Sequence, residues 1–61
     1  MFKIMMHDKN QYGFAVSLTK YEGDELISGF TLNSFKSVYE QQKYALEFAE
    51  LTGFVMEHDH D

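Results

Sequence analysis

Acidic and imidazole side chains are the groups in this chain best suited to metal binding or acid–base catalysis, because cysteine is absent. Ten Asp and Glu residues occur with three histidines, His7, His58 and His60. The C-terminal sequence HDHD has the composition of a metal site, but it lies in a terminal tail without further residues to orient the ligands. We therefore expect no metal site and no cofactor.

Nucleophilic catalysis would need a serine or threonine next to a base. Ser17, Ser28, Ser34 and Ser37 have no histidine close to them in the sequence, and neither a glycine-rich phosphate loop nor a nucleophile elbow is present. A chain of 61 residues also has little room to enclose a pocket that excludes water. The sequence therefore predicts a binding protein, not an enzyme.

The charge balance limits the class of partner. Ten acids face five lysines and no arginine, which gives a formal net charge of −5. Arginine is the residue best suited to bidentate phosphate and guanine contacts, and nucleic-acid binders normally carry a basic stripe. We expect no direct binding to DNA or RNA. The acidity favours either a partner with a basic surface or simple solubility.

Membrane insertion and export are not expected from the sequence. The N-terminal segment MFKIMMHDKN has an apolar run too short for a signal peptide. No segment approaches the roughly 20 apolar residues of a membrane span. We expect a soluble protein of the cytoplasm.

The N-terminal half of the chain has the hydropathy pattern of a β-hairpin. Residues 2–7 and 13–21 alternate apolar and polar side chains, as strands with one buried face do. Asp8 begins the sequence DKN, which is typical of a turn. Residues 25–30 form either a third strand or an extended lead into a helix.

The C-terminal half is predicted to be mainly helical. The helix spans residues 32–52, with Thr31 as its N-cap and Gly53 as its stop. A short strand over residues 54–57 and a fraying tail over residues 58–61 follow it. The whole 61-residue chain is thus expected to be one α+β domain: a small antiparallel sheet of two or three N-terminal strands and a short C-terminal strand, packed on one helix.

The predicted helix has two apolar faces when wound at about 100° per residue. The broader face carries Phe35, Val38, Tyr39, Ala45, Leu46 and Ala49. Tyr44, Phe48 and Leu51 gather on nearly the opposite side. A helix that covers a sheet needs only one apolar stripe, so this second stripe needs another surface. We expect a homodimer with these three residues at its interface; the alternatives are that an N-terminal segment covers them or that they are exposed.

Acidic residues also cluster. Glu22, Asp24 and Glu25, named the acidic turn below, are expected beside the start of the helix, and Glu40 lies one turn beyond Lys36. Exposed carboxylates beside aromatic side chains can imitate a DNA backbone to a protein that binds phosphates. The alternative is an ordinary solvated turn.

The segment GFTLNSFKSVY, residues 29–39, carries a resemblance to a known family. It resembles the segment that opens the helix in the small uracil-DNA glycosylase inhibitors of protein-primed Bacillus phages. The shared order is Gly, an apolar residue, a hydroxyl, Leu, two small polar residues, Phe, a charged position, then an apolar residue and Tyr. A hairpin before the helix, an apolar strand after it, acidity and the absence of cysteine agree with that family in layout.

The resemblance implies a homodimer that acts in the host cytoplasm as a DNA mimic. It would occupy the DNA-binding groove of uracil-DNA glycosylase and need no chemistry of its own. A pocket at the dimer seam, lined by Phe35 and Tyr39, would take up the leucine that the enzyme inserts into the minor groove.

This sequence differs from the family pattern at one partner-binding position. The residue after the phenylalanine is acidic in the family and is Lys36 here, so Glu40 or the acidic turn would supply the carboxylate that faces the enzyme. Two alternatives remain open. One is an acidic DNA mimic directed at another DNA-handling host protein, such as a restriction enzyme, a nuclease or a CRISPR effector. The other is a small structural or regulatory homodimer with its acids scattered over the surface.

Overall fold

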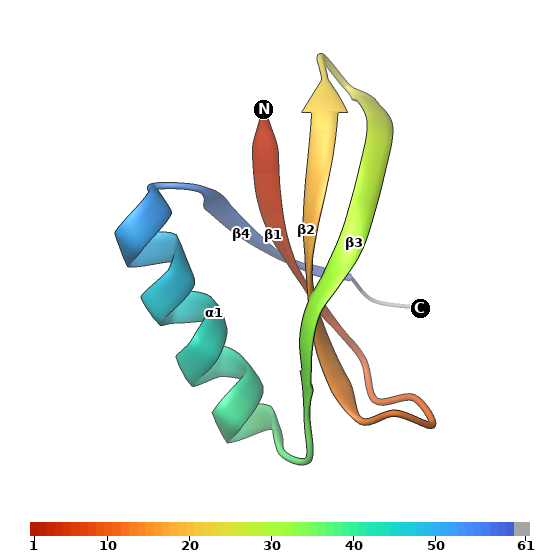
Figure 1. Ribbon diagram of the computed structural model, residues 1–61, viewed down its shortest axis with the longest axis vertical. Helices are drawn as coiled ribbons and strands as arrows, with labels where there is room; N and C mark the ends of the chain where they lie inside the picture. Colours follow the sequence, from red (N-terminus) through yellow and green to blue (C-terminus); the bar gives the residue numbers. More distant parts are fainter. Residues whose placement is uncertain (60–61) are drawn as a thin grey trace.

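Four strands and one helix make up most of the computed structural model, which describes residues 1–59 (Figure 1). In chain order they are β1 (Phe2–His7), β2 (Phe14–Glu22), β3 (Glu25–Phe35), α1 (Val38–Thr52) and β4 (Val55–Asp59). The strands form one sheet in the order β3-β2-β1-β4, and α1 packs on it, so the predicted α+β class is confirmed. Within residues 1–59, no helix has the length and apolar character needed to cross a membrane.

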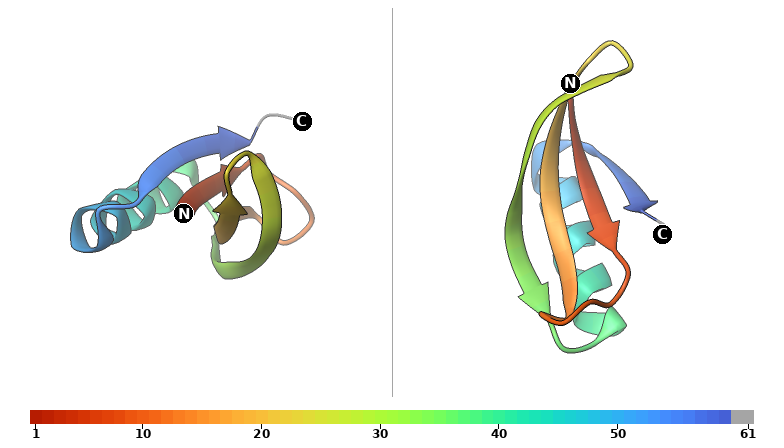
Figure 2. Two further views of the ribbon diagram at one scale, coloured as in Figure 1. Left: turned by 90° about the horizontal axis from the view of Figure 1, so that it is seen from above. Right: turned by 90° about the vertical axis from the view of Figure 1, so that its right-hand side faces the viewer.

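The sheet is mixed, and the prediction of an antiparallel sheet is wrong for its last strand. β1 pairs antiparallel with β2, and β2 pairs antiparallel with β3, but β4 runs parallel to β1. The reason is the connection through α1. Because the helix carries the chain back along the sheet, β4 runs in the same direction as β3 and therefore as β1. Figure 2 shows α1 on one face of the sheet, with the other face uncovered.

β3 is longer, and the helix shorter, than the sequence predicts. The strand expected over residues 25–30 continues to Phe35, which pairs with Phe14 on β2, and β-bulges accompany the pairing. Helix α1 begins at Val38, so the predicted start at residue 32 is wrong. Ser37, not Thr31, is the N-cap, and its Oγ accepts the N–H of Glu40 at 3.2 Å. Pairing with β2 gives the backbone of residues 31–35 hydrogen-bond partners that compete successfully with helix formation.

The end of the helix agrees with the prediction. Gly53 adopts a left-handed conformation with φ 77°, and its N–H donates to Ala49 O at 2.7 Å. The strand predicted over residues 54–57 is β4, which runs from Val55 to Asp59. Two residues of the expected fraying tail are therefore paired with β1, and residues 60–61 lie outside the described part of the chain.

The core lies between α1 and the face of the sheet that it covers. Ile4 of β1, Val16 of β2 and Ala45 of α1 are buried at its centre. Partly buried apolar side chains surround them: Met6, Leu18, Leu32, Phe35, Tyr44, Phe48, Ala49, Phe54 and Met56. Because Ile4 and Val16 face the helix, the alternate residues of β1 and β2 point to the uncovered face.

The two apolar stripes of the helix do not divide as the sequence predicts, although Ala45 and Ala49 of the broader stripe do face the core. Tyr44 and Phe48, expected at a dimer interface, pack against the core, and only Leu51 of that set is strongly exposed, at 86%. Tyr39 and Leu46 of the broader stripe are exposed at 73% and 52%. The exposed apolar side chains of α1 are therefore Val38, Tyr39, Leu46 and Leu51.

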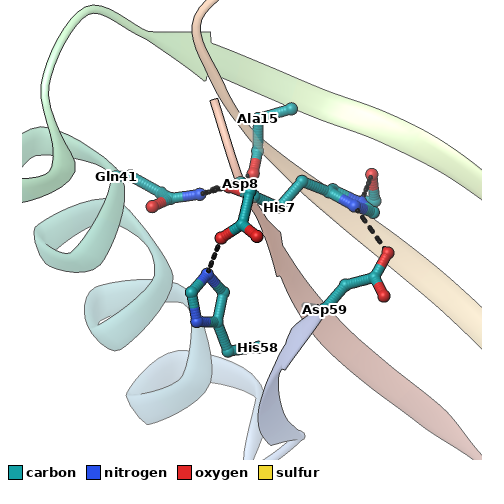
Figure 3. A network of polar contacts seen from close by, with 7 residues as sticks. His7, Asp8, Ala15, Gln41, His58 and Asp59 are labelled. Carbon is teal, nitrogen blue, oxygen red and sulfur yellow. Dashed lines mark hydrogen bonds and ion pairs between the residues drawn. The ribbon is translucent and has the colours of Figure 1, made fainter. Parts of the chain in front are cut away.

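One polar side chain fixes the helix to the sheet. Gln41 is 2% exposed, and its Nε2 donates to the backbone oxygens of His7 at 2.8 Å and Ala15 at 2.9 Å (Figure 3). These oxygens belong to the end of β1 and the start of β2. A buried amide nitrogen with both hydrogens bound this way holds three elements in one arrangement.

Candidate functional site

The structure separates the two aromatic residues that the resemblance places in one pocket. Phe35 ends β3, and its ring packs against Tyr44 with the centroids 5.2 Å apart. Tyr39 lies in the first turn of α1 with its side chain exposed. Because the helix begins after Phe35, the two side chains are not one helical turn apart. Phe35 contributes to the core, and Tyr39 remains available to a partner.

Tyr39 belongs to a shallow hollow on the outer side of α1, which we name the helix hollow. Its lining consists of Tyr39, Gln42, Lys43 and Leu46, and its volume is about 270 Å³. Gln42, Lys43 and Leu46 follow Tyr39 by three, four and seven residues, the spacing that brings side chains together on one helix face. The hollow joins an aromatic ring and an aliphatic side chain with polar groups between them.

Two carboxylates of the helix neighbour this hollow. Glu47 follows Lys43 by four residues and Glu50 follows Leu46 by four, so each lies one turn beyond a residue of the lining. Glu40, a predicted partner-binding residue, is exposed in the first turn. Lys36, in the link that precedes α1, is exposed as well.

The acidic turn lies far from the helix hollow, and its expected place beside the start of the helix is wrong. Glu22, Asp24 and Glu25 surround the β2–β3 turn, and the whole of β3 separates them from α1. Figure 1 shows this turn and the start of α1 at opposite ends of the long axis, along which the molecule measures 32 Å. The acidic turn and the hollow cannot form one small site.

A second group of side chains, which sequence reasoning missed, lies on the uncovered face of the sheet. His7 Nε2 is 2.8 Å from Ser17 Oγ. His7 Nδ1 is 3.2 Å from Asp59 Oδ2, and Figure 3 shows this second contact. The three residues come from β1, β2 and β4. Strand pairing sets their positions, because Ser17 is opposite Met5 and Asp59 is opposite His7.

The chemistry of the three groups sets the direction of these hydrogen bonds. A carboxylate only accepts, so the proton of a neutral His7 imidazole lies on Nδ1, toward Asp59. Nε2 is then the acceptor, and the Ser17 hydroxyl donates to it. This is the order of nucleophile, base and orienting carboxylate that activates serine in hydrolytic triads.

Further polar contacts join β4 to β1 and to the residue that follows β1. Lys3 Nζ lies 2.9 Å from Glu57 Oε1, and this hydrogen bond raises the pKa of Lys3. His58 Nε2 lies 3.1 Å from Asp8 Oδ1 (Figure 3). Within residues 1–59, no three His, Asp or Glu side chains are arranged to hold a metal ion.

No protein-family model, curated protein or solved structure matches this chain. The link to uracil-DNA glycosylase inhibitors therefore rests on residues 29–39 and on layout. In the structure these residues form the second half of β3, the link and the first two positions of α1.

Proposed function

We propose that the protein is a phage-type inhibitor of host uracil-DNA glycosylase that acts by binding and not by chemistry. The observation that carries the proposal is the helix hollow, an exposed site that joins Tyr39 and Leu46 to two polar side chains, next to helix carboxylates on a chain with a net charge of −5. Tyr39, one of the two residues that the resemblance assigns to the target pocket, lines it. Phe35 is removed from the partner-binding set because it belongs to the core.

The size and lining of the hollow suit an apolar side chain of a partner. The hollow, of about 270 Å³, is formed by one helix face and is open to solvent, so only a partner that covers it would enclose a side chain placed there. Inserting one aliphatic side chain beside Tyr39 and Leu46 would give the desolvated contact typical of an interface hot spot. In the proposed complex, the minor-groove leucine of the enzyme occupies the hollow.

In this proposal the negative charge of the protein makes it bind the enzyme and not DNA. Glu40, Glu47 and Glu50 outnumber Lys43 on the exposed helix, so its net charge is negative, which attracts a basic groove and repels phosphates. The acidic turn adds a second negative site at the far end of the 32 Å long axis, so an elongated groove would meet both. In this proposal Lys36 lies next to the helix carboxylates that contact the enzyme, and it does not supply the main contact itself.

Inhibition of uracil excision by matched variants tests the proposal. Tyr39→Ala should weaken inhibition by about 2 kcal/mol, or about 30-fold, on the usual scale of hot spots. Leu51→Ala is the matched control, because Leu51 is exposed on the same helix but outside the hollow. Equal losses in the two variants would remove the hollow from the proposal. Inhibition of another DNA-handling enzyme in place of this one would overturn the choice of target.

We also propose that the protein is a homodimer, with an interface that differs from the predicted one. Because Tyr44 and Phe48 pack in the core, the support now comes from the edge strand β3, where Leu26, Ile27 and Phe30 are exposed. An edge strand with unpaired backbone groups is suited to pairing with a second copy. Light scattering should give twice the chain mass of 7.2 kDa. A monomeric mass at the concentration used for inhibition would contradict this.

A further inference from the structure

His7 contacts a carboxylate through one ring nitrogen and a serine hydroxyl through the other, an arrangement that the proposed inhibitor does not use. Its Nδ1 contacts Asp59 at 3.2 Å and its Nε2 contacts Ser17 Oγ at 2.8 Å. Both distances are within the range of a hydrogen bond, and the second is close to the optimum. A serine held in this way can lose its proton to the imidazole while its oxygen attacks an electrophile.

Rigid elements hold this arrangement. Ser17 lies in β2, which is paired on both sides, and His7 and Asp59 are cross-strand neighbours on β1 and β4. Gln41 binds the backbone oxygen of His7 at 2.8 Å, which fixes the end of β1 (Figure 3). Reactive groups on paired strands keep their geometry better than groups on loops.

The exposure of the three side chains limits the size of a reactant. Ser17 is 8% exposed, whereas the side chains of His7 and Asp59 are 30% and 46% exposed. The imidazole is therefore partly exposed to solvent, and the hydroxyl lies deeper in the sheet between its cross-strand neighbours Met5 and Thr31. A reagent must be small at its electrophilic centre to reach the oxygen.

We propose that Ser17 is a nucleophile for acyl transfer from small activated esters, with His7 as its base and Asp59 as a positioning residue. Ser17 Oγ forms a bond to the carbonyl carbon while its proton passes to His7 Nε2. The bond from that carbon to the leaving oxygen then breaks, and the alcohol takes the proton. Water activated by His7 hydrolyses the acyl-serine and regenerates the hydroxyl. This site lies on the uncovered face of the sheet and is independent of the helix hollow.

The reaction is tested on the full chain with two reagents. A small fluorophosphonate should phosphonylate Ser17 and release fluoride, and peptide mass spectrometry locates the adduct. p-Nitrophenyl acetate should be hydrolysed, with release of p-nitrophenol. Ser17→Ala should abolish both reactions, and Ser28→Ala, which removes an exposed serine of β3, should change neither. A wild-type protein without an adduct at Ser17, or with adducts spread over exposed serines, would overturn the proposal.

Two further variants assign the roles of the partners. His7→Gln should slow phosphonylation of Ser17 about 100-fold or more, the usual contribution of a general base. Asp59→Asn should also slow it, and Asp59→Glu should restore part of the rate because a carboxylate can again orient the imidazole. Circular dichroism identifies any variant that fails to fold. If His7→Gln fails to fold, the Asp59 variants still test the proposal, because Asp59 lies at the exposed end of the network. An unchanged rate in folded Asp59→Asn would overturn the role of Asp59.

Discussion

The buried amide of Gln41 gives the sharpest test of how the helix is fixed to the sheet. Its Nε2 makes two hydrogen bonds, to His7 O and Ala15 O, at 2.8 and 2.9 Å, and its side chain is 2% exposed. Replacing it by alanine removes both donors and leaves a cavity between α1, β1 and β2. The change therefore acts on polar contacts and on packing together.

The expected cost follows from these contacts. Each hydrogen bond contributes about 0.5–1.5 kcal/mol net, and a buried group left without its partner costs about 1–3 kcal/mol. For Gln41→Ala we expect the free energy of unfolding to fall by about 2–4 kcal/mol. Gln41→Leu keeps most of the volume but loses both bonds, so it should recover only the packing part. A small domain has about 5–15 kcal/mol in total, so the loss is large.

Urea denaturation followed by circular dichroism measures this change, and the next residue provides the control. Gln42 is exposed, so Gln42→Ala makes the same chemical change in the same helix without removing a buried contact. It should change stability by less than about 0.5 kcal/mol. The gain in helix propensity is the same in both variants and cancels in the comparison. A difference below about 1 kcal/mol would refute the role given to Gln41.

Two backbone features give further predictions. Ser37→Ala should lower the free energy of unfolding by about 1 kcal/mol, because Ser37 Oγ caps the helix at Glu40 N. If the helix began at residue 32, position 37 would be interior and alanine would stabilise it, so the sign of the change in urea midpoint decides. Gly13→Ala should cost clearly more than Gly23→Ala, although φ is positive at both, because a Cβ at Gly13 would lie 2.3 Å from Phe35 O and one at Gly23 would meet no atom within 4 Å. Equal thermal shifts in the two variants would contradict the contact between the β1–β2 connection and the end of β3.

Features set by neighbouring residues could be predicted from the sequence. The strands expected over residues 2–7 and 13–21 occur as Phe2–His7 and Phe14–Glu22, because alternation of apolar side chains is a local signal. Gly53 ends the helix as expected, because glycine adopts the left-handed conformation at low cost.

Features set by long-range pairing could not be predicted in the same way. Leu32 and Phe35 are apolar at a spacing that suits a helix, but pairing of residues 31–35 with β2 makes them part of a strand. Tyr44 and Phe48, predicted at a dimer interface, instead pack on the core together with Ala45 and Ala49, whereas Tyr39 and Leu46 remain exposed.

The contacts of His7 could not be predicted from residues that are close to it in the sequence. Ser17 is 10 residues from His7 and Asp59 is 52 residues away. The predicted hairpin contained part of the signal, because alternation places His7 and Ser17 on the same face of adjacent strands. The parallel pairing of β4 with β1 brings Asp59 to His7, and the local alternation of apolar and polar residues does not indicate this pairing.

A titration of this protein into a uracil-excision reaction tests the central claim most directly. Purified bacterial uracil-DNA glycosylase acts on a uracil-containing oligonucleotide, and the product is measured as the protein is added. We predict full inhibition near one dimer per enzyme, relieved when the DNA concentration is raised before the protein is added. Undiminished excision by several bacterial orthologues, in the presence of an excess of folded protein, would contradict the proposed function.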